Sequence, residues 1–151
     1  MLKKQEKYNI AVIGATGIVG ESLLSILNDR SFPINNIHAV ASQKSKGAKV
    51  KFGDQLLTVK ALDEFDFGSI DIAFFSAGGA ISKEYAPKAA SQGCVVIDNT
   101  SEFRYVDNIP LIVPEVNPSD IEKYKETNII ANPNCSTIQM LVALKPLHDQ
   151  F

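Results

Sequence analysis

A cysteine between two kinds of predicted secondary structure is the most reactive group in this sequence. The apolar run Ile129–Ala131 predicts the end of a strand, and Pro133 breaks it because proline fixes its own φ and restricts the residue before it. Cys135 follows, and the apolar spacing after it predicts a helix. The unpaired N–H groups and positive dipole end of a helix start favour a thiolate. Cys135 is therefore a candidate nucleophile, with a small buried core residue as the alternative.

A glycine-rich turn near the N-terminus has the form of a phosphate site. Residues 8–14 (YNIAVIG) are typical of a strand buried on both faces, and a helix is expected after the turn. That helix would bury Val19, Leu23, Ile26 and Leu27. Strand, turn and helix together predict the pyrophosphate corner of a dinucleotide fold, in a G-x-x-G-x-x-G variant of the usual spacing. The candidate cofactor-binding residues here are Gly14, Thr16, Gly17, Ile18, Val19 and Gly20. Glycine turns also occur for purely structural reasons, which is the alternative.

The end of the second predicted strand, residues 37–41, indicates which dinucleotide would bind. An NAD site places an acidic residue there to bond the ribose 2′-hydroxyl. In this chain the first acid after the strand is Asp54. The strand is followed instead by SQKSKG at 42–47, whose two lysines and two serines suit a 2′-phosphate through charge-assisted hydrogen bonds. The pattern predicts NADP, with a solvated basic loop as the alternative.

The remaining pattern alternates strands with helices. Strands are expected at 71–77, 94–98 and 128–131, and a hairpin at 49–59. Extended chain interrupted by Pro114 is expected at 111–116, and helices at 85–92 and at 119–127, the latter capped by Ser119. This predicts an α/β fold, a doubly wound, mostly parallel sheet of the Rossmann type. Cys94 begins a central strand and is expected to be a core residue.

The carboxyl ends of parallel strands meet at one edge of a sheet. There the loops should gather Gly17, Ser42, Gly78, Asn99, Arg104 and Cys135. A cofactor corner, an arginine and a cysteine together indicate aldehyde–acyl chemistry. The thiolate would add to a carbonyl, a hydride would pass to or from the nicotinamide, and the arginine would hold a carboxylate or phosphate.

Composition places the chain among ordinary globular proteins. Its 151 residues, 45% hydrophobic and 21% charged, suffice for one domain with a sizeable core. The net charge of −2 argues against a nucleic-acid or basic membrane surface. No apolar run approaches the roughly 20 residues that span a bilayer, and the charged start MLKKQEKYN lacks a signal-peptide core. Two cysteines are too few for a disulfide scaffold, so we expect the cytoplasm.

Six motifs in order resemble the N-terminal part of the aspartate-semialdehyde dehydrogenase family, over nearly the whole chain from Tyr8 to His148. They are GATGIVG at 14–20, SQKSKG at 42–47, FSAGG at 75–79, DNTSEFR at 98–104, VPEVN at 113–117 and NPNCSTIQM at 132–140. The related N-acetyl-glutamyl-phosphate reductases usually carry a glycine before the cysteine, where this chain has Asn134, and they are the alternative within the class.

The resemblance implies roles for individual residues. Cys135 would be the acyl-thioester nucleophile, Asn134 would help shape its pocket, and Arg104 with Asn99 would hold the phosphoryl group. The implied cofactor contacts are Ser42, Lys44 and Ser45 to the 2′-phosphate of NADP, and Ala77 and Gly78 near the nicotinamide. The family reduces β-aspartyl phosphate to aspartate semialdehyde for lysine, threonine and methionine synthesis, and its members are usually homodimers or tetramers.

The chain departs from the family in length. We expect an extension at 1–7, a dinucleotide-binding domain at 8–134, and a cysteine helix at 135–151 that leads to a second domain carrying a glutamine and a histidine acid/base. His38 and His148 do not replace that histidine, since 13 residues of helix separate His148 from Cys135 by roughly 20 Å. We therefore expect no turnover by this chain alone. A non-catalytic NADP-binding module or assembly partner is the alternative.

Overall fold

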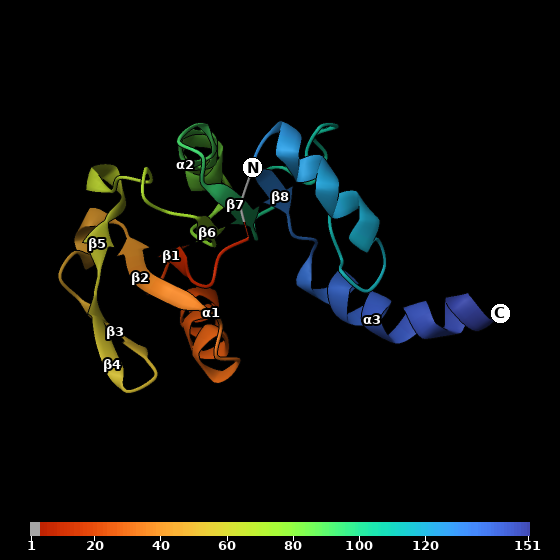
Figure 1. Ribbon diagram of the computed structural model, residues 1–151, viewed down its shortest axis with the longest axis horizontal. Helices are drawn as coiled ribbons and strands as arrows, with labels where there is room; N and C mark the ends of the chain where they lie inside the picture. Colours follow the sequence, from red (N-terminus) through yellow and green to blue (C-terminus); the bar gives the residue numbers. More distant parts are fainter. Residues whose placement is uncertain (1–3) are drawn as a thin grey trace.

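A parallel sheet forms the centre of the computed structural model, which describes residues 4–151 (Figure 1). Its six strands lie in the spatial order β5–β2–β1–β6–β7–β8, and every pairing among them is parallel. They are β5 (Lys60–Ala61), β2 (Ile34–Ala41), β1 (Tyr8–Ile13), β6 (Ile72–Phe75), β7 (Val95–Asp98) and β8 (Ile129–Ala131). Counted along the chain, this is the 3-2-1-4-5-6 order of a dinucleotide-binding sheet, and the order reverses between β1 and β6.

Helices cover both faces of this sheet, with α1 below and α2 above it in Figure 1. α1 (Ile18–Asp29) buries Leu24 and Leu27 against one face. α2 (Gly79–Ser91) packs against the opposite face through three small side chains, those of Ala86, Ala89 and Ala90. The predicted doubly wound α/β fold is therefore confirmed.

The buried face of α1 differs from the one that its apolar spacing predicts. Leu27 is buried as expected, but Val19 and Ile26 are 44% and 50% exposed. Gly20 and Leu24 are buried in their place. Gly20 lies against the backbone of the glycine corner, and this contact fixes the rotation of the helix.

The elements outside the sheet agree with the predictions in part. The hairpin is confirmed, because β3 (Lys49–Phe52) and β4 (Gln55–Thr58) pair antiparallel. α2 begins at Gly79 rather than at residue 85, and Gly93, with φ of +90°, follows its end. Two short 3-10 helices, η1 (Gln43–Ser45) and η2 (Leu62–Glu64), follow β2 and β5.

Residues 111–116 are not the extended segment that their sequence predicts. Leu111 forms one bridge to Ala131, but the chain then turns, because the N–H groups of Val116 and Asn117 both donate to the carbonyl of Val113. Pro114 lies inside this turn. The next helix, η3 (Pro118–Glu126), is 3-10 throughout and its cap is Asn117, so the prediction of a Ser119 cap is wrong.

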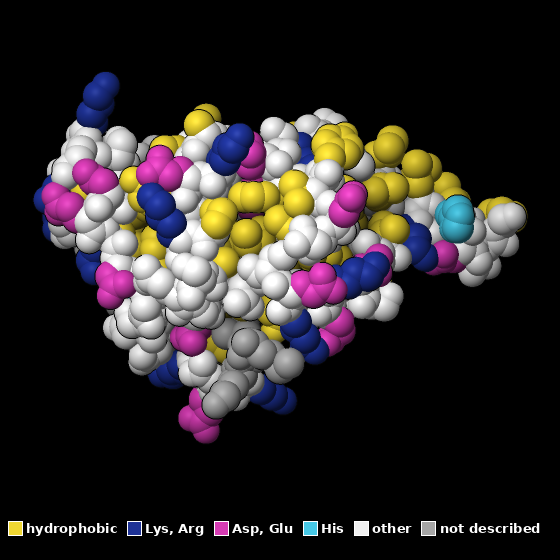
Figure 2. Space-filling model, turned by 90° about the horizontal axis from the view of Figure 1, so that it is seen from above, with side chains coloured by type: hydrophobic (Ala, Val, Ile, Leu, Met, Phe, Trp, Pro, Cys, Tyr) yellow, Lys and Arg dark blue, Asp and Glu magenta, His cyan; other side chains and the backbone are white. Residues whose placement is uncertain are grey.

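The last helix, α3 (Cys135–Gln150), extends away from the sheet, and none of its residues is buried (Figure 1). Its exposed apolar side chains are Met140, Val142, Leu144 and Leu147. Figure 2 shows hydrophobic side chains gathered along this arm. Contiguous exposed apolar surface in proteins marks interaction surfaces. Within residues 4–151, no helix is both long and apolar enough to cross a membrane.

Candidate active site

The glycine corner lies where β1 ends, at the reversal of the strand order. Gly14 has φ of +87°, and a Cβ there would lie 2.9 Å from the carbonyl carbon and oxygen of Ser76. Gly17 is the N-cap of α1 and has no side chain, so no side-chain acceptor of the cap occupies the N–H groups of the first turn. Thr16 is exposed, and Ile18 is 87% exposed. A corner of this shape can accept a phosphate against its backbone.

The end of the neighbouring strand is tied to this corner. Ser76 donates to the carbonyl of Ile13 from both its N–H, at 2.9 Å, and its hydroxyl, at 3.0 Å. Ala77 follows and is half-buried. Gly78 then turns the chain into α2 with φ of +98°, and a Cβ there would meet nothing within 4 Å. The position of Gly78, beside the glycine corner, is therefore open.

The loop after β2 carries the residues predicted to bind a 2′-phosphate. Lys44 is exposed on η1 and makes no ion pair within residues 4–151. Lys46, the second cation, forms an ion pair with Glu64, since its Nζ lies 2.5 Å and 2.8 Å from the two carboxylate oxygens. Gln43 donates to the same carboxylate at 2.7 Å. The expectation of two available cations is thus corrected to one, Lys44.

The two serines of that loop flank Lys44. Ser42 is exposed and precedes η1, while Ser45 is half-buried at its end. The N–H of Ser45 donates to the carbonyl of Ser42 at 2.9 Å, which closes the turn around Lys44. The three residues form one compact turn at the carboxyl end of β2.

Cys135 is the first residue of α3, and it is exposed. Asn134, predicted to help shape the cysteine's pocket, is the N-cap of this helix. Its side-chain oxygen accepts a hydrogen bond from the N–H of Ser136 at 2.9 Å. Cys135 therefore lies in the strand–turn–helix setting that its neighbours predict.

Cys94 is in the opposite environment, directly before β7. It is fully buried, as predicted, and burial raises the pKa of its thiol to about 12. The nearby charge of Asp71 is the second, smaller contribution to this rise in pKa. Cys94 is therefore a core residue that stays protonated at neutral pH.

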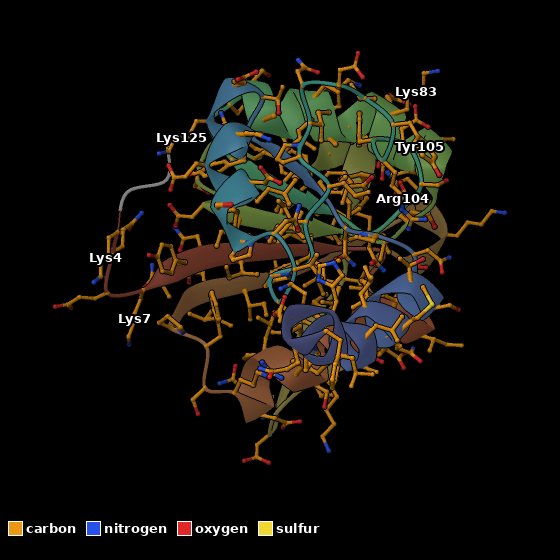
Figure 3. All side chains as sticks on the ribbon, turned by 90° about the vertical axis from the view of Figure 1, so that its right-hand side faces the viewer. Lys4, Lys7, Lys83, Arg104, Tyr105 and Lys125 are labelled. Atoms are coloured by element: carbon orange, nitrogen blue, oxygen red, sulfur yellow. The ribbon has the colours of Figure 1, made fainter. Side chains whose placement is uncertain are left out.

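Arg104 joins the ends of β7 and β8. Its Nε donates to the carbonyl of Asn132 at 3.0 Å, and Nη2 donates to the carbonyl of Asn99 at 3.3 Å. Nδ2 of Asn132 also donates to Oδ1 of Asn99 at 2.6 Å. Figure 3 shows Arg104 between the sheet and α3, while the neighbouring Tyr105 is 94% exposed. The guanidinium has five N–H donors, so these two bonds leave donors for an anion.

The same network lies close to Cys135. Three residues of chain reach at most about 11 Å, which bounds the Cα–Cα distance from Asn132 to Cys135. Since Arg104 is bonded to Asn132, the guanidinium and the thiol share one end of the sheet. An arginine with unused N–H donors and an exposed thiol therefore lie at the same end of the sheet.

A known protein family matches most of this chain. The family described as "Semialdehyde dehydrogenase, NAD binding domain" matches residues 9–124. The chain belongs to the semialdehyde dehydrogenase family. The aspartate-semialdehyde dehydrogenase of Legionella pneumophila is 59% identical over 141 residues, which are 93% of this chain and 41% of that protein. Aspartate-semialdehyde dehydrogenase 2 of Vibrio cholerae is 53% identical over 144 residues, 95% of this chain and 43% of that protein. The resemblance drawn from the six motifs is confirmed.

Solved structures of semialdehyde dehydrogenases share the fold. Aspartate semialdehyde dehydrogenase II of Vibrio cholerae, complexed with ASA, matches 95% of this chain and 47% of its own, with a TM-score of 0.92 and 53% identity. The Candida albicans enzyme with NADP matches 96% of this chain and 48% of its own, with a TM-score of 0.75 and 27% identity. A Rex-family repressor at 16% identity and a TM-score of 0.59 shares the fold alone. The chain spans less than half the length of these relatives.

Two residues of the candidate site were not predicted from the sequence. Asn132 links Arg104 to Asn99, and its signal was a polar residue between the strand end and Pro133. Asp98 binds the start of the arginine loop, and its signal was a single acid at the end of the apolar run CVVID. Both signals are short and common, so neither indicates a contact on its own.

Proposed function

We propose that the chain is the cofactor-binding and nucleophile-bearing part of a cytoplasmic, NADP-dependent aspartate-semialdehyde dehydrogenase. The observation that carries this proposal is the bond from Arg104 to Asn132, three residues before Cys135. An arginine that binds a phosphate and a thiol that attacks a carbonyl are what a reductive dephosphorylation requires. The proposed substrate class agrees with the names of the relatives and with the Vibrio cholerae structure complexed with ASA.

In the proposed reaction, Cys135 is the nucleophile and Arg104 binds the phosphoryl group. The Cys135 thiolate attacks the carbonyl carbon of β-aspartyl phosphate, the bond from that carbon to the phosphate oxygen breaks, and phosphate leaves with the electron pair. The product is a thioester on Cys135. NADPH, when bound, supplies the hydride that reduces the thioester carbonyl. The carbon–sulfur bond then breaks, which releases aspartate semialdehyde and returns the thiolate. Arg104 would bind the phosphoryl oxygens and stabilise their charge.

The glycine corner fits the cofactor that this reaction needs. A Cβ at Gly14 would lie 2.9 Å from the backbone of Ser76, and one at Gly20 would lie 2.2 Å from the carbonyl oxygen of Gly14. Glycine at both positions supports the tight turn and the close strand–helix packing of a pyrophosphate corner. Ser42, Lys44 and Ser45 would hold the 2′-phosphate, while Ala77 and Gly78 would lie beside the nicotinamide. The lack of an acid after β2 supports NADP over NAD, as does the NADP in the Candida albicans relative.

The domain plan follows from the same proposal. Residues 8–134 would be the cofactor domain, and α3 would lead into a second domain that covers its exposed apolar side chains. α3 continues through Pro146 as one helix, so His148 lies roughly 20 Å along it from Cys135. The acid/base group would come from the second domain, and the whole enzyme would be a homo-oligomer.

The test is an assay of NADPH formation from aspartate semialdehyde, NADP⁺ and phosphate. Residues 1–151 alone should bind NADP and show no steady-state turnover, since a missing acid/base typically costs ~10²–10⁴ in rate. Addition of a separately expressed C-terminal domain of a relative should restore turnover, and Cys135→Ser should abolish it again. Turnover by residues 1–151 alone, or restored activity that survives Cys135→Ser, would contradict the proposal.

A further inference from the structure

Asp98, the last residue of β7, is a carboxylate with no exposed surface. Its donors are all neutral: the hydroxyls of Ser82 and Thr100, each at 2.7 Å, and the N–H of Thr100 at 3.2 Å. Within residues 4–151, no lysine or arginine forms an ion pair with it. A buried carboxylate without a cation is costly, and here only these hydrogen bonds offset the cost. The Asp98 side chain is therefore held in the core by these three hydrogen bonds.

The hydrogen bonds of Asp98 lead to the loop that carries Arg104. Thr100 donates to Asp98 twice, and its hydroxyl oxygen accepts a hydrogen bond from the N–H of Glu102 at 3.3 Å. The carbonyl of Asp98 accepts the N–H of Asn132 at 2.8 Å, and Asn132 in turn binds Arg104. Asp98 thus contacts both segments on which the guanidinium rests: the loop through its side chain, and the end of β8 through its main chain.

We propose that Asp98 is a positioning residue that holds the 99–104 loop so that Arg104 stays beside Cys135. This inference rests on the proposed function, in which Arg104 binds the phosphoryl group. Asp98 is buried and acts through Thr100, while Ser82 fixes the same carboxylate to α2. The two hydroxyls therefore have different roles, because only the one on Thr100 belongs to the arginine loop.

The readout is the ratio of two alkylation rates at Cys135 in residues 1–151. A nearby positive charge speeds the anionic reagent iodoacetate relative to neutral iodoacetamide. Because both reagents attack the same thiolate, a change in its pKa or in the folded fraction of the protein alters both rates equally and leaves the ratio unchanged. In water, a unit charge about 10 Å away changes the rate of an anionic reagent about twofold, so at low ionic strength the loss of Arg104 should lower this ratio by about that factor, and salt should remove the difference. Mass spectrometry separates Cys135 from the buried Cys94.

Thr100→Val and Ser82→Ala are the matched pair, since each removes one hydroxyl donor to the same carboxylate. Thr100→Val should lower the ratio to the level of Arg104→Ala, and Thr100→Ser should restore it. Ser82→Ala should keep the parent ratio even if it lowers stability. Asp98→Asn should behave like Thr100→Val. Circular dichroism confirms that each variant is folded, and Thr100→Val decides the question if Asp98→Asn does not fold.

The outcomes separate this inference from the proposed function. If Arg104→Ala lowers the ratio while Thr100→Val and Asp98→Asn keep the parent value, Asp98 is structural and the positioning role is overturned. If Arg104→Ala also keeps the parent ratio, Arg104 is not beside the thiol, and the phosphate anchor of the proposed function fails together with the inference.

Discussion

The sheet buries its apolar side chains, whereas helix α3 exposes many of its own. Residues 10–13 of β1 have no exposed surface, whereas no residue of α3 is buried and Leu147 is 56% exposed. Each region carries one cysteine: Cys94 is buried directly before β7, and Cys135 is exposed at the start of α3. Stability therefore resides in the sheet, and the proposed chemistry lies where the chain leaves it.

The largest expected difference is in stability. Leu24→Ala in α1, where the side chain has no exposed surface, should lower the free energy of unfolding by about 2–5 kcal/mol. Leu144→Ala in α3, where the side chain is 46% exposed, should change it by less than about 0.5 kcal/mol. Urea unfolding followed by circular dichroism measures both values. Equal losses would mean that α3 is packed as tightly as α1.

The two cysteines should differ in reactivity almost as strongly. With a pKa of about 12, the Cys94 thiol stays protonated and buried, so Cys135 should react with iodoacetamide at least ~100-fold faster at neutral pH. Mapping after brief labelling gives the two rates. Denaturation in urea is the control and should remove most of the difference. Faster labelling of Cys94 in the folded chain would refute this assignment of the two sites.

A smaller contrast separates Lys44 from other surface lysines. Lys44→Gln should weaken NADP binding about tenfold and leave NAD binding nearly unchanged, because a charge-assisted hydrogen bond contributes ~1.5–3 kcal/mol. Lys51→Gln, an equal charge change on the exposed side of β3, is the matched control. Calorimetric titration of both cofactors measures the preference. Equal loss of both cofactors would contradict the 2′-phosphate contact.

The smallest expected effect concerns Glu64, an exposed counterpart of the buried Asp98. Hydrogen bonds from Lys46 and then Gln43 lower the pKa of Glu64 from 4.5, so its contribution to stability is present above pH 4.5 and is lost as pH falls further. Thermal unfolding of parent and Glu64→Gln should therefore differ slightly at neutral pH and converge in acid. Salt should shrink the gap, since the pair is exposed. A gap that widens in acid would show that the sign is wrong.

The sequence predicts the sheet well because its strands are buried on both faces. Continuous apolar runs rich in β-branched residues, such as residues 8–13 and 95–98, predict buried strands. Their alternation with helices predicts parallel pairing. The strand–turn–helix context of Cys135 is equally local, since Pro133 and the apolar spacing lie within a few residues of it.

The contacts that the sequence does not predict depend on distant parts of the chain. The rotation of α1 is set by Gly20 against the glycine corner, and the early start of α2 includes Ser82, which binds the buried Asp98. Nothing near Arg104 indicates that its acceptor is the carbonyl of Asn132, because that pairing depends on β7 and β8 being neighbours. The roles of the predicted site residues stay predictions until the variants are measured.

The place of β1 inside the sheet has a consequence for how the molecule is made. A growing polypeptide is synthesised N-terminus first, at about 5–20 residues per second. β1 is therefore made before both of its neighbours in the sheet, β2 and β6. β2 supplies the first partner and β6 the second, so the glycine corner has its neighbours once residues 8–76 are out. Arg104 has no acceptor on β8 until Asn132 follows it, 28 residues later. The dinucleotide corner is thus in place on the nascent chain before the cysteine beside it has been synthesised.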